Sequence, residues 1–212
     1  MRWESLQFEQ YGIYQDEELG RFTEDPVHLV HFLHAKKNER AVDLGTGNGI
    51  IPLYAEALYG CSFTGIDVDR EQLRLARLSA ERNGQHILFH QMDVSDAPKA
   101  LGCGQFDLVT MNPPYFSSAS AGQDGQRASQ RHGDRLGDFL SAAFLLLNNG
   151  GRLCLCFRAD ALVDLLALMR INRLEPKRME LLSAGKRVKV VLLEAKKLGK
   201  PGMDVFVSTG QN

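Results

Sequence analysis

Apolar runs of strand length alternate with segments of helical period from about residue 40 onward. Strands are expected at 39–45, 62–68, 87–94, 106–111, 151–157, around 178–183 and at 187–195. Helices are expected between them, at 50–60, 69–84, 136–150 and 159–172. Because this alternation is typical of βαβ units and a mostly parallel sheet, the sequence predicts an α/β fold.

The chain has the size and composition of one folded domain. Its 212 residues are 44% hydrophobic and 24% charged, and roughly 100–200 residues form a typical domain. We therefore expect a single domain over 1–212. Within it we expect an N-terminal arm and lid at 1–38, a mobile substrate loop at 116–135 that is rich in Ser, Gly, Gln and Arg, and a basic C-terminal part at 170–212.

No targeting or membrane segment is expected. The N-terminus has no apolar stretch preceded by a basic region, and no window approaches the ~18 apolar residues of a spanning helix. The sequence thus predicts a cytoplasmic protein without a membrane partner. Cys61, Cys103, Cys154 and Cys156 include no C-x-x-C spacing, so we expect reduced, packed thiols.

The net charge of −1 conceals an uneven distribution. Residues 170–212 hold ten lysines and arginines against four acidic residues, a balance of +6, and the first 169 residues hold 15 against 22, a balance of −7. A basic surface of this kind fits a polyanion partner. Lysines that protect solvated strand edges are the alternative explanation.

A glycine-rich turn joins the first expected strand of the alternating series to a helix. The stretch "VDLGTGNG" places Gly45, Gly47 and Gly49 there. A backbone without Cβ atoms approaches a ligand closely, and the following helix N-terminus offers unpaired N–H groups. The G-x-G-x-G spacing differs from the G-x-G-x-x-G of dinucleotide-binding enzymes.

Acidic residues end three successive strands of this series, at Asp43, Asp67 and Asp93. Ligands bind at this edge of an open α/β sheet, and Asp67 is placed to accept hydrogen bonds from the two hydroxyls of a ribose. Glycine-rich turns and Asp-initiated turns also form for purely local reasons. In combination, however, they favour a nucleoside-type ligand.

The stretch "FDLVTMNPPYF", residues 106–116, ends a strand in an asparagine, two prolines and two aromatic residues. Pro113 and Pro114 restrict the backbone, so the Asn112 side chain and the Pro113 carbonyl form a rigid pair of acceptors. Such a pair can hold the two N–H groups of a planar amino group while Tyr115 stacks on the flat substrate. Hydrogen bonds that strengthen as the nitrogen becomes cationic favour the transition state. A plain proline-rich turn is the alternative for the tetrapeptide in isolation.

Taken together, "DLGTGNG", "GIDVD", "MDV" and "NPPYF" resemble the ordered motifs of class I S-adenosylmethionine-dependent methyltransferases, over roughly residues 20–195. The resemblance implies a Rossmann-like, seven-stranded, mostly parallel sheet whose last strand is antiparallel. It also implies S-adenosyl-L-methionine as the cofactor and methylation of a planar amino nitrogen. The catalytic motif it implies consists of Asn112, Pro113, Pro114 and Tyr115.

A closer resemblance is to the bacterial family of tRNA1(Val) (adenine-37-N6)-methyltransferases. It is carried by "GRFTEDPVHLVHFL", by "NPPYF" with the Ser/Gly/Arg loop after it, and by the tail "LEAKKLGKPG". This resemblance implies tRNA as the partner and the exocyclic N6 amino group of an adenosine as the substrate. The family often has Arg-His-Glu after the loop, whereas here Arg131-His132 is followed by Gly133-Asp134, so no role is carried over to a glutamate.

The two resemblances together imply a set of binding residues. Those expected to bind the cofactor are Phe22, Thr23, Asp43, Gly45, Thr46, Gly47, Asp67, Val68, Asp93, Val94 and Asn112. Those expected to bind the substrate are Tyr115, Phe116, Arg127, Arg131, Arg135, Lys186, Arg187 and Lys189.

Other acceptors and another class of protein stay open. The Asn-Pro-Pro-Tyr motif also accompanies methylation of guanine N2 in rRNA and of glutamine N5 in proteins, and a non-catalytic module that binds the cofactor or RNA is possible. His28, His31 and His34 recur every three residues, but no carboxylate or cysteine completes a metal set, so we expect no metal. Trp3, Phe8 and Tyr11 are expected in an N-terminal arm that packs on the sheet, with stacking on a base as the alternative.

Overall fold

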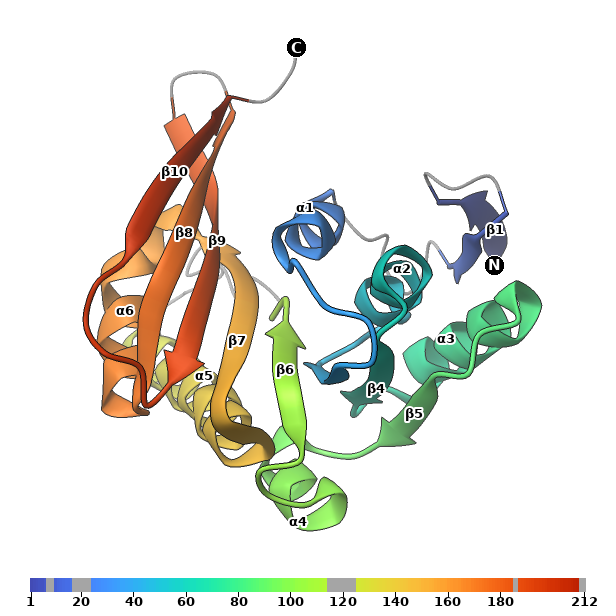
Figure 1. Ribbon diagram of the computed structural model, residues 1–212, viewed down its shortest axis with the longest axis horizontal. Helices are drawn as coiled ribbons and strands as arrows, with labels where there is room; N and C mark the ends of the chain where they lie inside the picture. The colour runs from blue at the N-terminus through green and yellow to red at the C-terminus, as the bar shows by residue number, and fades with distance from the viewer. Residues whose placement is uncertain (7–9, 17–23, 114–124, 185–186, 210–212) are drawn as a thin grey trace.

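The computed structural model describes residues 1–6, 10–16, 24–113, 125–184 and 187–209, without the side chains of 125–134, 184 and 209. A mixed sheet of eight strands forms its centre, in the order β10-β8-β9-β7-β6-β3-β4-β5 (Figure 1). The strands are β3 (Arg40–Leu44), β4 (Ser62–Asp67), β5 (Leu88–Gln91), β6 (Phe106–Met111), β7 (Leu147–Arg158), β8 (Leu174–Ala184), β9 (Arg187–Lys197) and β10 (Asp204–Thr209).

Helices cover both faces of this sheet (Figure 1). They are α1 (Asp25–Phe32), α2 (Ile50–Tyr59), α3 (Arg70–Asn83), α4 (Ala97–Leu101), α5 (Gly125–Leu146) and α6 (Leu162–Ile171). Side chains alternate between the faces along each strand. Thus Leu108 of β6 packs in the core under α1, α2 and α3, and Val109 packs in the core under α4, α5 and α6. No helix within the described ranges is long and apolar enough to cross a membrane.

Helix α3 illustrates how the sequence fixes local structure. The Asp69 side chain accepts hydrogen bonds from the Glu71 and Gln72 amides and starts the helix. Leu73, Ala76 and Ala80 are buried along one face, and Gly84 ends the helix in the left-handed region at φ 70°. The prediction of a helix over 69–84 is therefore confirmed.

The expectation of seven strands needs a correction, although the α/β class and the mostly parallel sheet are confirmed. Strand β9, expected as the last, is antiparallel to both of its neighbours. An eighth strand, β10, follows it and pairs parallel with β8 at the edge of the sheet. It is short and its Val205, Phe206 and Val207 are exposed. Pairing with a strand about 25 residues away in sequence decides its conformation, and no local pattern encodes that partner.

The segment expected to be a loop at 116–135 is helical over its second half. Helix α5 begins at Gly125 rather than near residue 136, and residues 114–124 lie outside the described residues. The sequence "QRASQR" at 126–131 contains good helix formers, and their propensity outweighs the glycine and serine content that suggested a loop.

The N-terminal arm packs on a helix rather than on the sheet. Strands β1 (Arg2–Ser5) and β2 (Gly12–Gln15) form an antiparallel hairpin beside α3 (Figure 1). The Asn83 side chain bonds both the Gly12 amide, at 3.0 Å, and the Gly12 carbonyl, at 2.9 Å. The Arg82 guanidinium lies 4.1 Å from the centre of the Trp3 ring. Trp3 is thus held by an arginine of α3.

Candidate active site

The glycine turn that follows β3 leaves its backbone accessible to a ligand at Gly47. The Gly45 and Thr46 amides donate to the Ile66 carbonyl at 2.9 Å each, which ties the turn to β4. Gly47 has φ 54°, and a Cβ atom placed on it would meet nothing within 4 Å. The backbone therefore faces open space at Gly47, where the left-handed conformation favours glycine.

Asp43 is a buried carboxylate directly before this turn. Only 1% of it is exposed, and Thr110 of the neighbouring strand donates to its Oδ1 at 2.6 Å. Its Oδ2 has no hydrogen-bond partner among the described residues. Burial raises the pKa of Asp43 to about 7; the nearby Thr110 and Thr46 hydroxyls oppose this rise, and the charge of Asp67 adds to it. The Thr46 hydroxyl influences the pKa of Asp43 by proximity, because its Oγ1 makes no hydrogen bond within the described ranges.

Asn112 lies beside Asp43 at the end of the adjacent strand. The register pairs Asp43 with Thr110 and Leu44 with Met111, which places Asn112 opposite the start of the glycine turn. Its Oδ1 is buried and lacks a partner in the part of the chain that the structure describes. We call Asp43 Oδ2 and Asn112 Oδ1 the acceptor pair. A buried acceptor without a donor costs about 1–3 kcal/mol, so both atoms fit a ligand that supplies N–H groups.

Asp67 and Asp93 each use carboxylate oxygens to hold local turns. Asp67 Oδ1 accepts from the Asp69 amide at 2.9 Å, and Oδ2 accepts from the Gly47 amide at 2.8 Å. Asp93 Oδ1 accepts from the Ser95 amide and hydroxyl, and these bonds hold the pKa of Asp93 below its usual value. Both carboxylates are therefore oriented acceptors at the carboxyl edge of the sheet.

A cleft lies between these strand ends and α5. Phe139 of α5 approaches the glycine turn, 3.4 Å from where a Cβ atom on Gly45 would lie, and Arg135 Nη2 lies 3.6 Å from Asp93 Oδ2. The residues that line the cleft are Gly45, Ile66, Asp67, Val68, Met92, Val94, Arg135 and Phe139. Sequence reasoning missed Ile66, Met92 and Phe139. The only signal for Ile66 and Met92 is an apolar residue next to a polar strand end, and Phe139 lies within α5 with no such signal. Arg135, which the sequence predicts to contact the substrate, lines this cleft.

Several expected site residues lie outside the described residues. They are Phe22, Thr23, Pro114, Tyr115, Phe116 and Lys186, and the side chains of Arg127 and Arg131 in α5 are also not described. The roles of these residues stay predictions. The structure does bring together Asp43, the glycine turn, Asp67, Asp93 and Asn112 at one edge of the sheet.

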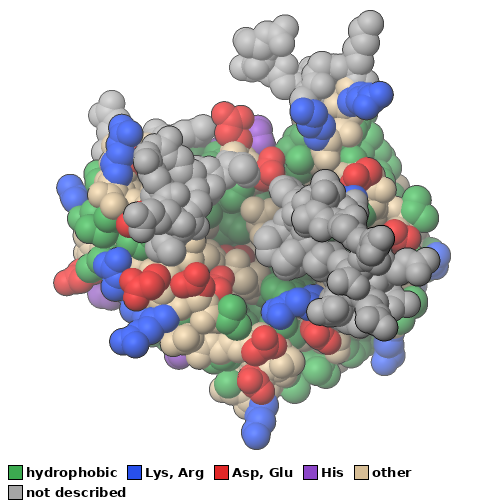
Figure 2. Space-filling view, turned by 180° about the vertical axis from the view of Figure 1, so that it is seen from behind, with side chains coloured by type: hydrophobic (Ala, Val, Ile, Leu, Met, Phe, Trp, Pro, Cys, Tyr) green, Lys and Arg blue, Asp and Glu red, His purple; other side chains and the backbone are tan. Residues whose placement is uncertain are grey.

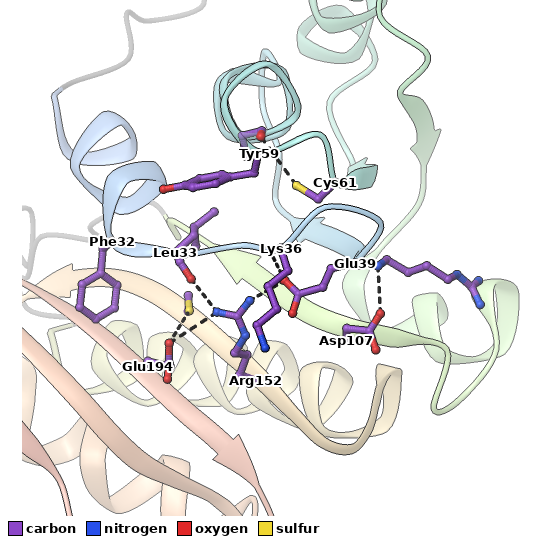
Figure 3. Close-up of polar contacts among 12 residues, drawn as sticks. Phe32, Leu33, Lys36, Glu39, Tyr59, Cys61, Asp107, Arg152 and Glu194 are labelled. Atoms are coloured by element: carbon purple, nitrogen blue, oxygen red, sulfur yellow. Dashed lines mark hydrogen bonds and ion pairs between the residues drawn. The ribbon is translucent and has the colours of Figure 1, made fainter.

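A cluster of four charged side chains fixes α1 to the C-terminal half of the sheet; Figure 3 shows three of them, Glu39, Arg152 and Glu194. We call Glu39, Arg152, Arg178 and Glu194 the arginine cluster. Arg152 lies 2.6 Å from Glu39 Oε2 and 3.7 Å from Glu194 Oε2, and Arg178 lies 3.1 Å from the same oxygen. Arg152 also donates to the carbonyl of Leu33, just after α1 ends, at 2.6 Å. Cations suit a helix C-terminus, so the cluster holds α1 in place.

The basic C-terminal part does not form a single surface. In the strand register, Lys196 of β9 lies opposite Arg152 of β7 and Glu175 of β8. This end of the β8–β9 hairpin is at the edge of the sheet opposite the cleft. The other end of the hairpin extends past β7, whose last partner is Val190. Arg187 and Lys189 are exposed there, and Figure 2 shows basic side chains on this projecting end.

Two of the three histidines in the N-terminal series have structural partners. His31 Nε2 lies 3.1 Å from the Tyr54 hydroxyl, and His34 Nδ1 lies 3.1 Å from Arg178. All four cysteines are free thiols, as expected, but Cys103 is exposed rather than packed. Burial raises the pKa of the Cys61 thiol to about 11.

Comparison with known proteins decides the family. The family model "Methyltransferase small domain" matches residues 12–164, which is well over half of the chain. The chain belongs to this methyltransferase family. The match includes the glycine turn, the acidic strand ends and the "NPPY" stretch, so the resemblance to methyltransferases is confirmed.

Curated relatives share a common name. The tRNA1(Val) (adenine(37)-N6)-methyltransferase of Vibrio vulnificus strain YJ016 is 28% identical over 137 residues, covering 64% of this chain and 57% of the relative. The protein of the same name from Porphyromonas gingivalis strain W83 is 31% identical over 148 residues, covering 66% and 58%. The chain thus spans less than three fifths of the length of these two relatives.

Solved structures agree on the fold. A "predicted O-methyltransferase" from Agrobacterium tumefaciens has a TM-score of 0.70 at 20% identity, covering 86% of this chain and 85% of that one. TrmN from Thermus thermophilus has 0.64 at 24%, covering 82% and 48%. A geranyl diphosphate methyltransferase in complex with S-adenosylmethionine has 0.60 at 16%, covering 81% and 84%. The family and this complex agree with the cofactor expected from the sequence.

Proposed function

We propose that this protein is an S-adenosyl-L-methionine-dependent methyltransferase that modifies the N6 amino group of an adenosine in tRNA. The observation that carries the proposal is the buried Asn112 Oδ1, which has no donor among the described residues and stands beside Asp43 at the edge of the sheet. The family match supports methyl transfer. The names of the curated relatives support adenine 37 of a valine tRNA as the acceptor.

The residues present fit the cofactor. Asp67 and Asp93 offer oriented carboxylates for its ribose and adenine, and Gly47 faces open space where its methionine part would pass. The cofactor supplies an electrophilic methyl group on a sulfonium. The proposed cofactor-binding residues are Phe22, Thr23, Asp43, Gly45, Thr46, Gly47, Asp67, Val68, Asp93, Val94 and Asn112.

The chain's own residues would orient the acceptor amino group. Asn112 Oδ1 and the Pro113 carbonyl accept its two N–H groups, and Tyr115 stacks on the base. These hydrogen bonds strengthen as the nitrogen gains positive charge, so they stabilise the transition state more than the ground state. Alignment of the nitrogen with the methyl group provides the rest of the acceleration, and no strong base is needed.

The projecting end of the β8–β9 hairpin is our candidate for the RNA contact. Arg187 and Lys189 are exposed at the same edge of the sheet as the acceptor pair, and Lys186 precedes them in sequence. Cations placed this way contact phosphates without reading the base sequence. The loop arginines Arg127 and Arg131 are proposed to contribute further phosphate contacts.

The decisive experiment incubates the protein with labelled S-adenosylmethionine and unmodified total tRNA, followed by nucleoside analysis. We expect N6-methyladenosine as the labelled product. Methylguanosine, or label confined to protein, would instead assign the site to another planar amino group. An absence of transfer despite cofactor binding would favour a non-catalytic module.

Charge reversal at the hairpin end tests the RNA surface separately. The variant Lys186→Glu/Arg187→Glu/Lys189→Glu should bind tRNA more weakly and with a shallower salt dependence, because fewer counterions are released. The matched control reverses Lys196 and Lys200, which belong to the opposite edge of the sheet and should change tRNA affinity little. Equal tRNA affinity of the triple variant and the native protein would show that the end of the β8–β9 hairpin does not contact the RNA.

A further inference from the structure

We propose that Arg135 is shared between the two ligands: it pairs with Asp93 in the free protein, and cofactor binding releases it to an RNA phosphate. This inference rests on the proposed function, because it needs both a cofactor and an RNA. It assigns Arg135 a role in linking the two binding events in addition to the phosphate contact expected from the sequence.

The geometry places Arg135 inside the cofactor cleft. It lies on α5 one turn before Phe139, and both side chains line the cleft with Gly45, Asp67 and Val94. Its Nη2 atom lies 3.6 Å from Asp93 Oδ2. Arg135 therefore borders both the cleft and the Asp93 carboxylate.

The two oxygens of Asp93 have different roles. Oδ1 is committed to the Ser95 amide, at 3.0 Å, and to the Ser95 hydroxyl, at 2.8 Å. Oδ2 has Arg135, a residue that lines the cleft, as its ion-pair partner. An adenine amino group that takes Oδ2 as its acceptor therefore competes with Arg135 for this oxygen.

The ion pair is weak enough to be exchanged. Its side chains are 51% and 42% exposed, and exposed pairs at such separations contribute little because water and salt screen them. Breaking the pair should therefore cost no more than about a two- to fivefold change in ligand affinity. That cost allows a ligand to displace Arg135 while still leaving a measurable effect.

Release of Arg135 links cofactor and RNA binding. Arg135 lines the same cleft as Gly45, and Asn112 lies opposite the start of the glycine turn, so a freed guanidinium at residue 135 lies on the side of the sheet edge where we propose that the base binds. A cation that leaves Asp93 becomes available to a phosphate, which its planar fork suits. By thermodynamic reciprocity, the cofactor should then raise RNA affinity by the same factor by which RNA raises cofactor affinity.

The first test measures cofactor affinity without RNA. Titration calorimetry with S-adenosylhomocysteine at low salt compares the native protein with Arg135→Gln, and we expect the variant to bind about two- to fivefold more tightly because its competitor is gone. The control Arg74→Gln removes a similarly exposed arginine that pairs with Glu71 on α3, away from the cleft, and should not change affinity. Weaker or equal binding by Arg135→Gln would overturn the competition for Asp93.

The second test measures tRNA affinity with and without S-adenosylhomocysteine. The native protein should bind tRNA more tightly when the cofactor product is present, and Arg135→Gln should lose this difference. A cofactor effect that persists in Arg135→Gln would overturn the transfer to phosphate. If tRNA binds neither protein, the proposed RNA substrate fails and so does the transfer, while the first test still decides the competition.

Discussion

The arginine cluster and the acceptor pair are both buried polar groups of one sheet, yet they are satisfied in opposite ways. In the arginine cluster, Glu194 Oε2 pairs with Arg152 and Arg178. Arg152 also pairs with Glu39 and donates to the Leu33 carbonyl (Figure 3). In the acceptor pair, Asp43 Oδ2 and Asn112 Oδ1 have no partner among the described residues.

This difference separates a structural role from a functional one. A partnered cluster contributes to holding α1, β7, β8 and β9 together. Removing one member leaves the remaining charges buried without a partner of opposite charge. An unpartnered acceptor pair lowers the stability of the free protein, and this loss is offset only when a ligand supplies hydrogen-bond donors. Substitutions should therefore affect stability in the first group and ligand chemistry in the second.

The largest expected effect is on turnover. Asn112→Ala removes an acceptor of the amino group, and loss of one such preorganised group lowers kcat by about 10²–10³-fold. The unfolding free energy should stay close to its native value, because no hydrogen bond with a described residue is lost. Single-turnover methylation and urea unfolding check the two quantities.

The conservative variant Asn112→Asp serves as the control, since it retains an acceptor oxygen and should retain more activity than Asn112→Ala. If Asn112→Ala loses stability as severely as activity, the asparagine is structural and the contrast between the two groups disappears.

The next largest effect is on stability. Arg152→Ala leaves Glu39 and part of Glu194 without a cation, and breaking a largely buried pair costs about 3 kcal/mol of unfolding free energy. The Arg152 side chain is 17% exposed, which reduces the cost relative to full burial. Urea unfolding of Arg152→Ala and of Arg152→Lys, which keeps the charge, measures it.

The exposed pair of Arg74 with Glu71 provides the matched comparison for Arg152. Arg74→Ala should cost less than about 1 kcal/mol, as is usual for surface pairs. Similar unfolding free energies for Arg152→Ala and Arg74→Ala would show that the arginine cluster does not hold the fold.

For a change of one pH unit, the smallest effect is a pH dependence of stability. The pKa of Asp43 is about 7 in the folded protein because of burial, and 3.8 is the usual value that we expect after unfolding. Between these values the folded state binds more protons than the unfolded state, so raising the pH through about 4 to 7 lowers the unfolding free energy, by at most about 1.4 kcal/mol per pH unit. The stability contributed by protonated Asp43 is complete below about pH 4.

Asp43→Asn removes this titration. The difference in unfolding free energy between Asp43→Asn and the native protein should therefore shift in favour of the variant as the pH rises from 5 to 8. A difference that stays constant with pH would show that burial does not raise the pKa of Asp43.

Much of the fold and part of the site could be predicted from local pattern. The α3 boundaries and the glycine turn follow from capping residues and spacing, whereas the antiparallel direction of β9 is expected only from the resemblance to class I methyltransferases. Strand β10 could not be predicted this way, because its conformation depends on pairing with β8, a partner distant in sequence.

The sequence by itself determined which polar residues meet at the cleft. The carboxyl ends of parallel strands share one edge, so Asp43, Asp67, Asp93 and Asn112 had to gather there once the strands were recognised. Only the tertiary structure decided how these groups are satisfied. Arg135 reaches Asp93 from 42 positions away along the chain, and Arg152 reaches Glu39 from 113. Pairing at such separations depends on how helices and strands pack, and no local pattern in the sequence encodes it.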